Sequence, residues 1–155
     1  APDVVELGSA AQLHICSLPG HRLGAHVWLS GHIMARFIAE GRCPSIPGAR
    51  CLEIGAGVGI VGISAALVGG ATSVVLTDKA EMLPLMHHNL ELNGLGGRCR
   101  AASLEWGAPP QPDWGAFDVV LAADVVYPTA DPTCLLALRD TLLAACSKAT
   151  LVLAY

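Results

Sequence analysis

Apolar and polar residues are arranged along this chain in blocks that predict short strands alternating with helices. Apolar runs of strand length fall at residues 4–7, 12–17, 50–54, 73–77, 98–103, 117–122 and 150–155. Apolar residues recur at helical spacing at residues 27–39, in the segment that ends at Gly69 and Gly70, and at residues 80–92 and 132–146. This alternation predicts an α/β fold, a doubly wound and mainly parallel sheet with a short hairpin and a helix in front of it.

The length and the order of these elements predict one domain. A chain of 155 residues is long enough to bury a single core. We expect residues 1–26 to form the hairpin region and residues 27–155 to form the α/β core. The nearly all-apolar run 117–122 is typical of a central strand, whereas the short run 98–103, which carries two arginines, is typical of an outer strand.

Composition narrows the function classes. Apolar residues make up 53% and charged residues 14% of the chain, with a formal net charge of −4 and no basic block, so nucleic acid is not the expected partner. The six cysteines form no CxxC pair and no zinc-type cluster, which predicts a reduced, cytoplasmic protein without a metal site. The adjacent histidines His87 and His88 would point to different faces of a helix.

A membrane span is a competing interpretation of one stretch. No residue from 54 to 77 is charged, and a span needs about 20 apolar residues. Six glycines interrupt this run, and acids rather than basic or aromatic residues flank it. The stretch therefore fits a helix followed by a strand better, and no membrane association is expected.

The same stretch carries the strongest chemical signal. A strand, a glycine-rich turn, a helix and a second strand that ends on Asp78 have the layout of a nucleotide-binding βαβ unit. Two motifs overlap there. Residues 57–62 fit GxGxxG, which favours a dinucleotide, and residues 53–59 fit ExGxGxG. Asp78 could grip a ribose diol, cap the following helix or do both, so it does not choose between cofactors.

Asp124 is the second chemical signal. It follows the apolar run 117–122, where an unpaired acid costs free energy, so a role in a site is favoured over a purely structural one. Trp28 and Trp106 fit either a cofactor pocket or a half-buried core. Tyr127 precedes Pro128 and could simply enter a turn.

Four pieces in order resemble a known family. They are Val27-Trp28, the ExGxGxG turn, Leu104-Glu105-Trp106-Gly107 and Ala123-Asp124-Val125-Val126-Tyr127, the last matching a DxxY signature. Together they resemble the seven-strand, S-adenosylmethionine-dependent methyltransferases of methyltransferase family sixteen, the methyltransferase-like 21-type protein-lysine methyltransferases. The likeness runs from about residue 24 to residue 155.

The resemblance implies S-adenosylmethionine as cofactor and a lysine of a protein as substrate. It assigns Asp124 and Tyr127 to the incoming amine. It assigns to the cofactor Trp28, Glu53, Gly55, Ala56, Gly57, Asp78, Trp106 and Ala123. The family fold adds a sixth and a seventh strand beyond the fifth strand, on which this sequence ends, so the resemblance implies a fragment or an abbreviated form. A small-molecule methyltransferase, a dinucleotide-dependent oxidoreductase and a non-catalytic scaffold stay open as alternatives.

Overall fold

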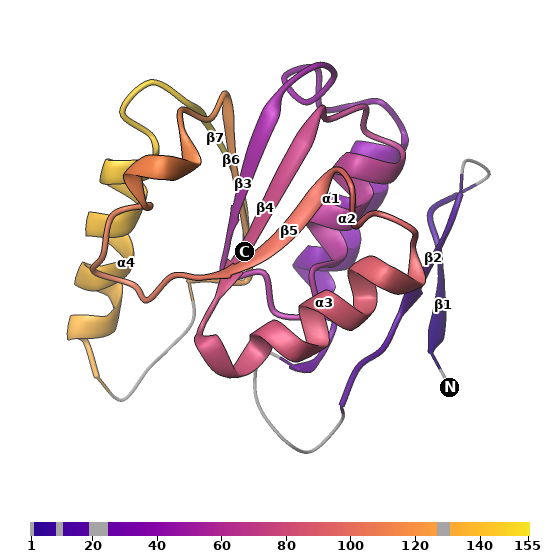
Figure 1. Ribbon diagram of the computed structural model, residues 1–155, viewed down its shortest axis with the longest axis horizontal. Coiled ribbons are helices and arrows are strands. Elements are labelled where there is room, and N and C mark those ends of the chain that lie inside the picture. Colours follow the sequence, from indigo (N-terminus) through magenta and orange to yellow (C-terminus); the bar gives the residue numbers. More distant parts are fainter. Residues whose placement is uncertain (1, 9–10, 19–24, 127–130) are drawn as a thin grey trace.

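A five-stranded parallel sheet forms the centre of the molecule, in the order β5-β4-β3-β6-β7 (Figure 1). The computed structural model describes residues 2–8, 11–18, 25–126 and 131–155. The strands of this sheet are β3 (Arg50–Ile54), β4 (Ser73–Asp78), β5 (Cys99–Ser103), β6 (Val119–Ala123) and β7 (Thr150–Ala154). All neighbouring pairs are parallel. The predicted doubly wound α/β fold is confirmed, with β6 inside the sheet and β5 at one edge.

Helices cover both faces of the sheet. Helices α1 (Leu29–Ala39), α2 (Ile60–Leu67) and α3 (Leu83–Leu92) lie on one side and α4 (Thr133–Ala145) on the other (Figure 1). Side chains of successive strand residues pack against the two helical layers in alternation. Cys51 packs on the side of α1–α3, and Leu52 packs with Leu138 on the side of α4. This alternation is the period-two geometry of a strand buried on both faces.

A separate hairpin precedes the sheet, as predicted. Strands β1 (Asp3–Glu6) and β2 (Gln12–Ile15) pair antiparallel. Leu7, Leu13 and Ile15 are buried in the same apolar core as α2 and α3. The hairpin therefore lies against the helical layer rather than extending the main sheet (Figure 1).

The predicted helix at residues 80–92 is present in two parts. A 3-10 turn, η2 (Ala80–Met82), leads directly into α3, and Pro84 lies in the first turn of α3. Proline is tolerated there because the backbone N–H groups of a first turn have no partner inside the helix. A second 3-10 turn, η3 (Pro112–Trp114), extends past the predicted surface loop at 108–113 and buries Trp114.

The uncharged run at residues 54–77 is divided between α2 and β4. Among the helices that the structure describes, none is long and apolar enough to cross a bilayer. All six cysteines are free thiols. Within the described ranges, no group of three or more His, Cys, Asp or Glu side chains could hold a metal ion.

Candidate functional site

A cavity of about 640 Å³ opens at the carboxyl ends of β3, β4 and β6. Ligand sites in open α/β sheets lie at this edge. The cavity brings together every sequence-predicted site residue that the structure describes, and these are Trp28, Glu53, Gly55, Ala56, Gly57, Asp78, Trp106, Ala123 and Asp124. Tyr127 lies outside the described residues, so its predicted role stays a prediction.

The turn after β3 forms the floor of the cavity. The Gly59 N–H donates to the Ala56 carbonyl at 2.7 Å, which closes a turn with Gly57 and Val58 at its two central positions. Gly55 has φ +67°, and a Cβ atom there would lie 2.7 Å from Cγ1 of Val125. A side chain at this position would therefore both strain the backbone and collide with the loop after β6.

Asp78 joins this turn to the end of β4. Its Oδ2 accepts from the Gly57 N–H at 2.8 Å, and its Oδ1 accepts from the Lys79 N–H at 2.8 Å. A carboxylate has about four acceptor positions, so two remain available toward the cavity. The predicted capping role is not confirmed, because Lys79 is the N-cap residue of η2 and Asp78 Oδ1 accepts only from the Lys79 N–H, just before the first turn.

Glu53 lies beneath the turn and is only 3% exposed. Its Oε2 accepts from the Gly62 N–H of α2 at 2.9 Å. Burial raises the pKa of the Glu53 carboxyl to about 8, the Gly62 hydrogen bond opposes this rise, and the nearby charge of Asp78 adds to it. Glu53 lines the cavity, and its hydrogen bond to Gly62 holds α2 against β3. This bond supports the turn between β3 and α2 whether or not Glu53 touches a ligand.

Two tryptophans line the cavity from segments far apart in the sequence. Trp28 caps the start of α1 and is 47% exposed, with its ring centroid 6.1 Å from that of His26 in an edge arrangement. Trp106 is half-buried and packs against the core on the α4 side of the sheet. Both rings thus have the mixed apolar and exposed character expected of a ligand wall.

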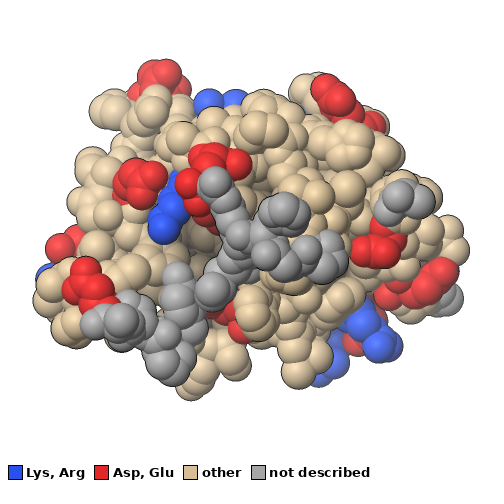
Figure 2. Space-filling view, turned by 90° about the horizontal axis from the view of Figure 1, so that it is seen from below, with Lys and Arg blue, Asp and Glu red and all other residues tan. Residues whose placement is uncertain are grey.

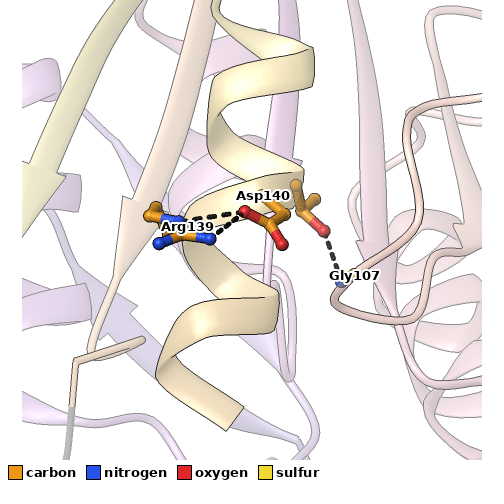
Figure 3. A network of polar contacts seen from close by, with 4 residues as sticks. Gly107, Arg139 and Asp140 are labelled. Carbon is orange, nitrogen blue, oxygen red and sulfur yellow. Dashed lines mark hydrogen bonds and ion pairs between the residues drawn. The ribbon is translucent and has the colours of Figure 1, made fainter. Parts of the chain in front are cut away.

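The loop that carries Trp106 is fastened to α4. The Gly107 N–H donates to Oγ1 of Thr141 at 2.8 Å (Figure 3), and the same hydroxyl donates to the Ala108 carbonyl at 3.0 Å. Thr141 is fully buried, whereas the neighbouring Arg139–Asp140 pair is exposed. Because nothing in the sequence pairs residue 141 with residue 107, the sequence analysis did not find this support.

Asp124 has the most unusual geometry in the cavity. Its φ is +55°, the one positive value among the non-glycine residues that the structure describes. Its backbone N–H donates to the Ala154 carbonyl at 3.0 Å, which ties this position to the end of β7. Its Oδ2 atom is buried and receives no hydrogen bond from the described residues. Strained backbone and an orphaned acceptor are features of functional sites.

Acidic side chains outnumber basic ones in the cavity. Among the described residues, one lysine, Lys79, lines it together with six acids: Glu53, Asp78, Glu81, Glu105, Asp124 and Asp131. Of these acids, Glu53 is mostly protonated at neutral pH because burial raises its pKa to about 8. Figure 2 views the face on which these strands end and shows carboxylate residues spread across it with few basic ones. Such a field favours cationic ligands over anionic ones.

Part of this acidic wall was not predicted from the sequence. Glu105 and Asp131 follow β5 and β6, so their position after a strand was the available signal. Asp131 accepts from the Thr133 N–H at 2.9 Å and from the Thr133 hydroxyl at 2.6 Å, just before α4. These two hydrogen bonds, the hydroxyl one first, lower the pKa of Asp131.

Comparison with known proteins agrees with this geometry. A family model described as lysine methyltransferase matches residues 7–155. The chain is 39% identical over 119 residues to the mouse EEF1A lysine methyltransferase 3, covering 75% of this chain and 50% of that protein. It is 37% identical over 115 residues to the protein N-lysine methyltransferase METTL21A of Danio rerio, covering 68% and 50%.

A solved structure shows the same fold at lower identity. The O-methyltransferase family 2 protein of Planctomyces limnophilus, in complex with apigenin, superimposes with a TM-score of 0.61. The match is 18% identical in sequence and covers 79% of this chain and 38% of the other. The matched part of this chain spans about half the length of the two curated relatives, so their names describe longer proteins.

Proposed function

Since this chain belongs to the lysine methyltransferase family, we propose that its cavity binds S-adenosylmethionine and that it methylates a lysine side chain of a protein. The names of the relatives support a protein substrate, and the fold supports the cofactor. We further propose that residues 1–155 belong to a single methyltransferase domain and that the protein is cytoplasmic. The glycine turn, Asp78, Asp124 and the two tryptophans supply the chemistry argued below.

The observation that carries the proposal is the orphaned acceptor of Asp124. Oδ2 is buried without a donor from the described residues, at the end of β6 and in the wall of the cavity. A buried acceptor of this kind is costly unless a ligand supplies a donor. A lysine amine entering the cavity would be such a donor.

The residues of the cavity fit the proposed cofactor. A volume of about 640 Å³ lies within the usual range for cofactor sites, roughly 300–1,000 Å³. The free acceptor positions of Asp78 suit two ribose hydroxyls, and the half-buried Trp106 ring suits the adenine. The glycine turn permits close backbone approach, and the excess of acids suits a cationic molecule. When bound, S-adenosylmethionine would supply an electrophilic methyl group on a sulfonium.

Asp124 would prepare the nucleophile. A lysine ammonium has a pKa near 10.4 and must lose its proton before nitrogen can attack. Desolvation in the cavity and a neighbouring positive charge would both lower that pKa, and together they must outweigh the carboxylates of the wall, which raise it, so that the proton passes to solvent. Asp124 Oδ2 would accept a hydrogen bond from the amine and direct its lone pair toward the cofactor side of the cavity. Positioning of this kind supplies much of the rate in a displacement reaction. Tyr127, three residues on, is proposed as a wall for the lysine side chain.

Two measurements test the proposal. Calorimetry of the purified protein should show binding of S-adenosylhomocysteine and none of NADH. Tight NADH binding would instead revive the dinucleotide interpretation of residues 57–62. Incubation with labelled S-adenosylmethionine and a cell lysate should then label a protein band, with the methyl group mapped to lysine.

The lysate experiment carries a matched pair of variants. Asp124→Asn removes the carboxylate in the cavity, and Asp140→Asn makes the same change at an exposed position of α4. The label should disappear with the first variant and persist with the second. Label found only in small molecules would point to a small-molecule methyltransferase, and binding without any transfer would point to a scaffold.

A further inference from the structure

Asn89 of α3 and Asn93, the C-cap residue of α3, bind backbone groups of the N-terminal hairpin segment in the way that a neighbouring strand would. Asn93 Oδ1 accepts from the His14 N–H at 3.0 Å, and its Nδ2 donates to the His14 carbonyl at 2.7 Å. One helical turn earlier, Asn89 Oδ1 accepts from the Cys16 N–H at 2.8 Å, and its Nδ2 donates to the Cys16 carbonyl at 3.1 Å. The four-residue spacing on the helix thus matches the two-residue spacing along the strand direction of β2.

Asn89 makes one contact that Asn93 lacks. Its Nδ2 also donates to the carbonyl of Val58 at 2.9 Å, inside the turn that forms the floor of the cavity. Asn89 is fully buried, and its side-chain oxygen and both N–H groups form hydrogen bonds. The partners are Cys16, 73 residues earlier in the sequence, and Val58, 31 residues earlier. Asn93 instead directs its further donation to the Asn89 carbonyl at 2.7 Å. One side chain therefore connects the hairpin with the turn.

The turn is held from two sides. At its two central residues, the Gly57 N–H is bound by Asp78 and the Val58 carbonyl is bound by Asn89. Without the Asn89 contact, the Val58–Gly59 peptide would be held only by the Gly59 N–H, which donates to the Ala56 carbonyl at 2.7 Å. A shift of this peptide would move Gly57 and Val58, which line the cavity.

We propose that Asn89 is a positioning residue for the cofactor turn and that it couples the order of the N-terminal hairpin to cofactor binding. The inference rests on the proposed cofactor, and it adds a supporting residue 11 positions beyond Asp78 that does not line the cavity. Coupling of this kind is reciprocal: binding at the turn must stabilise β2 by as much as β2 stabilises the bound turn.

Three variants in α3 separate positioning from simple destabilisation. Asn89→Ala removes both links, Asn93→Ala removes only the hairpin link, and Leu90→Ala removes buried apolar contacts from the same helix without touching the turn. Binding of S-adenosylhomocysteine is measured by calorimetry at a temperature at which circular dichroism shows each variant folded.

We expect Asn89→Ala to raise the Kd about 3- to 10-fold, the value of about one hydrogen bond, and the two controls to change it less than about 2-fold. The KM for S-adenosylmethionine should rise in parallel, with kcat little changed. Equal losses in Asn89→Ala and Leu90→Ala would overturn the positioning role. Should Asn89→Ala not fold, Asn89→Ser is used, because its short hydroxyl cannot reach both Cys16 and Val58.

Hydrogen exchange supplies a readout that does not need the cofactor. The Gly59 amide, which closes the turn, should exchange faster in Asn89→Ala than in either control. Added S-adenosylhomocysteine should slow exchange of the Cys16 amide in wild type and Asn93→Ala but not in Asn89→Ala. Failure of the wild type to bind would contradict the proposed function, whereas unchanged Gly59 exchange would contradict the role of Asn89 by itself.

Discussion

Glu53 and Gly62 are joined by a buried hydrogen bond of 2.9 Å that fastens the first turn of α2 to the middle of the sheet. The contact leaves no room for a side chain at position 62 of α2. A Cβ atom at Gly62 would lie 2.5 Å from Glu53 Oε2 and 3.1 Å from Val74 Cγ1. The third glycine of the GxGxxG pattern therefore serves the packing of helix on strand, whichever cofactor is bound.

Gly62→Ala is expected to lower the free energy of unfolding by about 1–3 kcal/mol, because the added methyl group must displace Glu53 or α2. Urea unfolding followed by circular dichroism measures the change. Gly96→Ala is the control, since a Cβ atom there meets nothing within 4 Å. A Gly62→Ala variant as stable as the control would show that α2 can move away from β3 at no cost.

The raised pKa of Glu53 predicts how stability depends on pH. The carboxyl has an ordinary pKa of 4.5 and a folded-state pKa of about 8. Below pH 4.5 it is protonated in both states and costs nothing. Between 4.5 and 8 the unfolded chain ionises and the folded protein does not, so stability falls by at most about 1.4 kcal/mol per pH unit, and it levels off above 8.

Glu53→Gln should remove this dependence, since an amide oxygen can still accept from Gly62 and cannot ionise. Unfolding free energies of wild type and variant, measured from pH 5 to pH 9, should diverge in favour of the variant as pH rises. Parallel curves would show that Glu53 is already ionised in the folded protein at neutral pH.

The strained backbone at Asp124 predicts a conflict between stability and activity. At φ +55° a glycine adopts the backbone conformation without strain, whereas the Cβ atom of an alanine strains it. Asp124→Gly should therefore be more stable than Asp124→Ala by about 1 kcal/mol. Both variants lack the carboxylate and should lose methyl transfer alike. Thermal unfolding measures the difference in stability, and the labelled-lysate assay measures methyl transfer. Methyl transfer by Asp124→Gly would show that the reaction does not need the Asp124 carboxylate.

Asp78 should contribute to cofactor affinity through the acceptor oxygens of its carboxylate. Asp78→Ala removes the acceptor for Gly57 and the acceptors proposed for the ribose, so the Kd for S-adenosylhomocysteine should rise by about 10- to 100-fold. Calorimetry measures this change, with the exposed Asp140→Ala as control. An unchanged Kd in Asp78→Ala would place the ribose elsewhere in the cavity.

Thr141 should act on the site from α4. Thr141→Val keeps the shape of the side chain and removes the hydroxyl that binds Gly107 and Ala108, which should cost about 1–3 kcal/mol of stability and loosen the loop that carries Trp106. Tryptophan fluorescence and urea unfolding report the two effects. Thr141→Ser keeps the hydroxyl and should restore most of both, whereas losses in Thr141→Ser as large as those in Thr141→Val would show that the hydroxyl does not hold the loop.

The sequence by itself determined the elements and their order. The strand β3 has the predicted bounds, 50–54, because a short run with apolar residues at Cys51, Leu52 and Ile54, between a loop and a glycine turn, is typical of a strand. The residues at the carboxyl ends of strands were also accessible. Parallel strands of an open sheet bring their carboxyl ends to one edge, which is why Asp78 and Asp124 line the same cavity.

Tertiary structure alone decided how those residues are held. The partners of Asn89 lie 31 and 73 residues away, and those of Thr141 lie 33 and 34 residues away, so no local pattern could show them. The positive φ of Asp124 and the rise in the pKa of Glu53 come from packing and burial in the folded chain. Local sequence selects strands, helices and turns through short-range sterics and periodicity, whereas side-chain contacts across the sheet exist only once the core has closed.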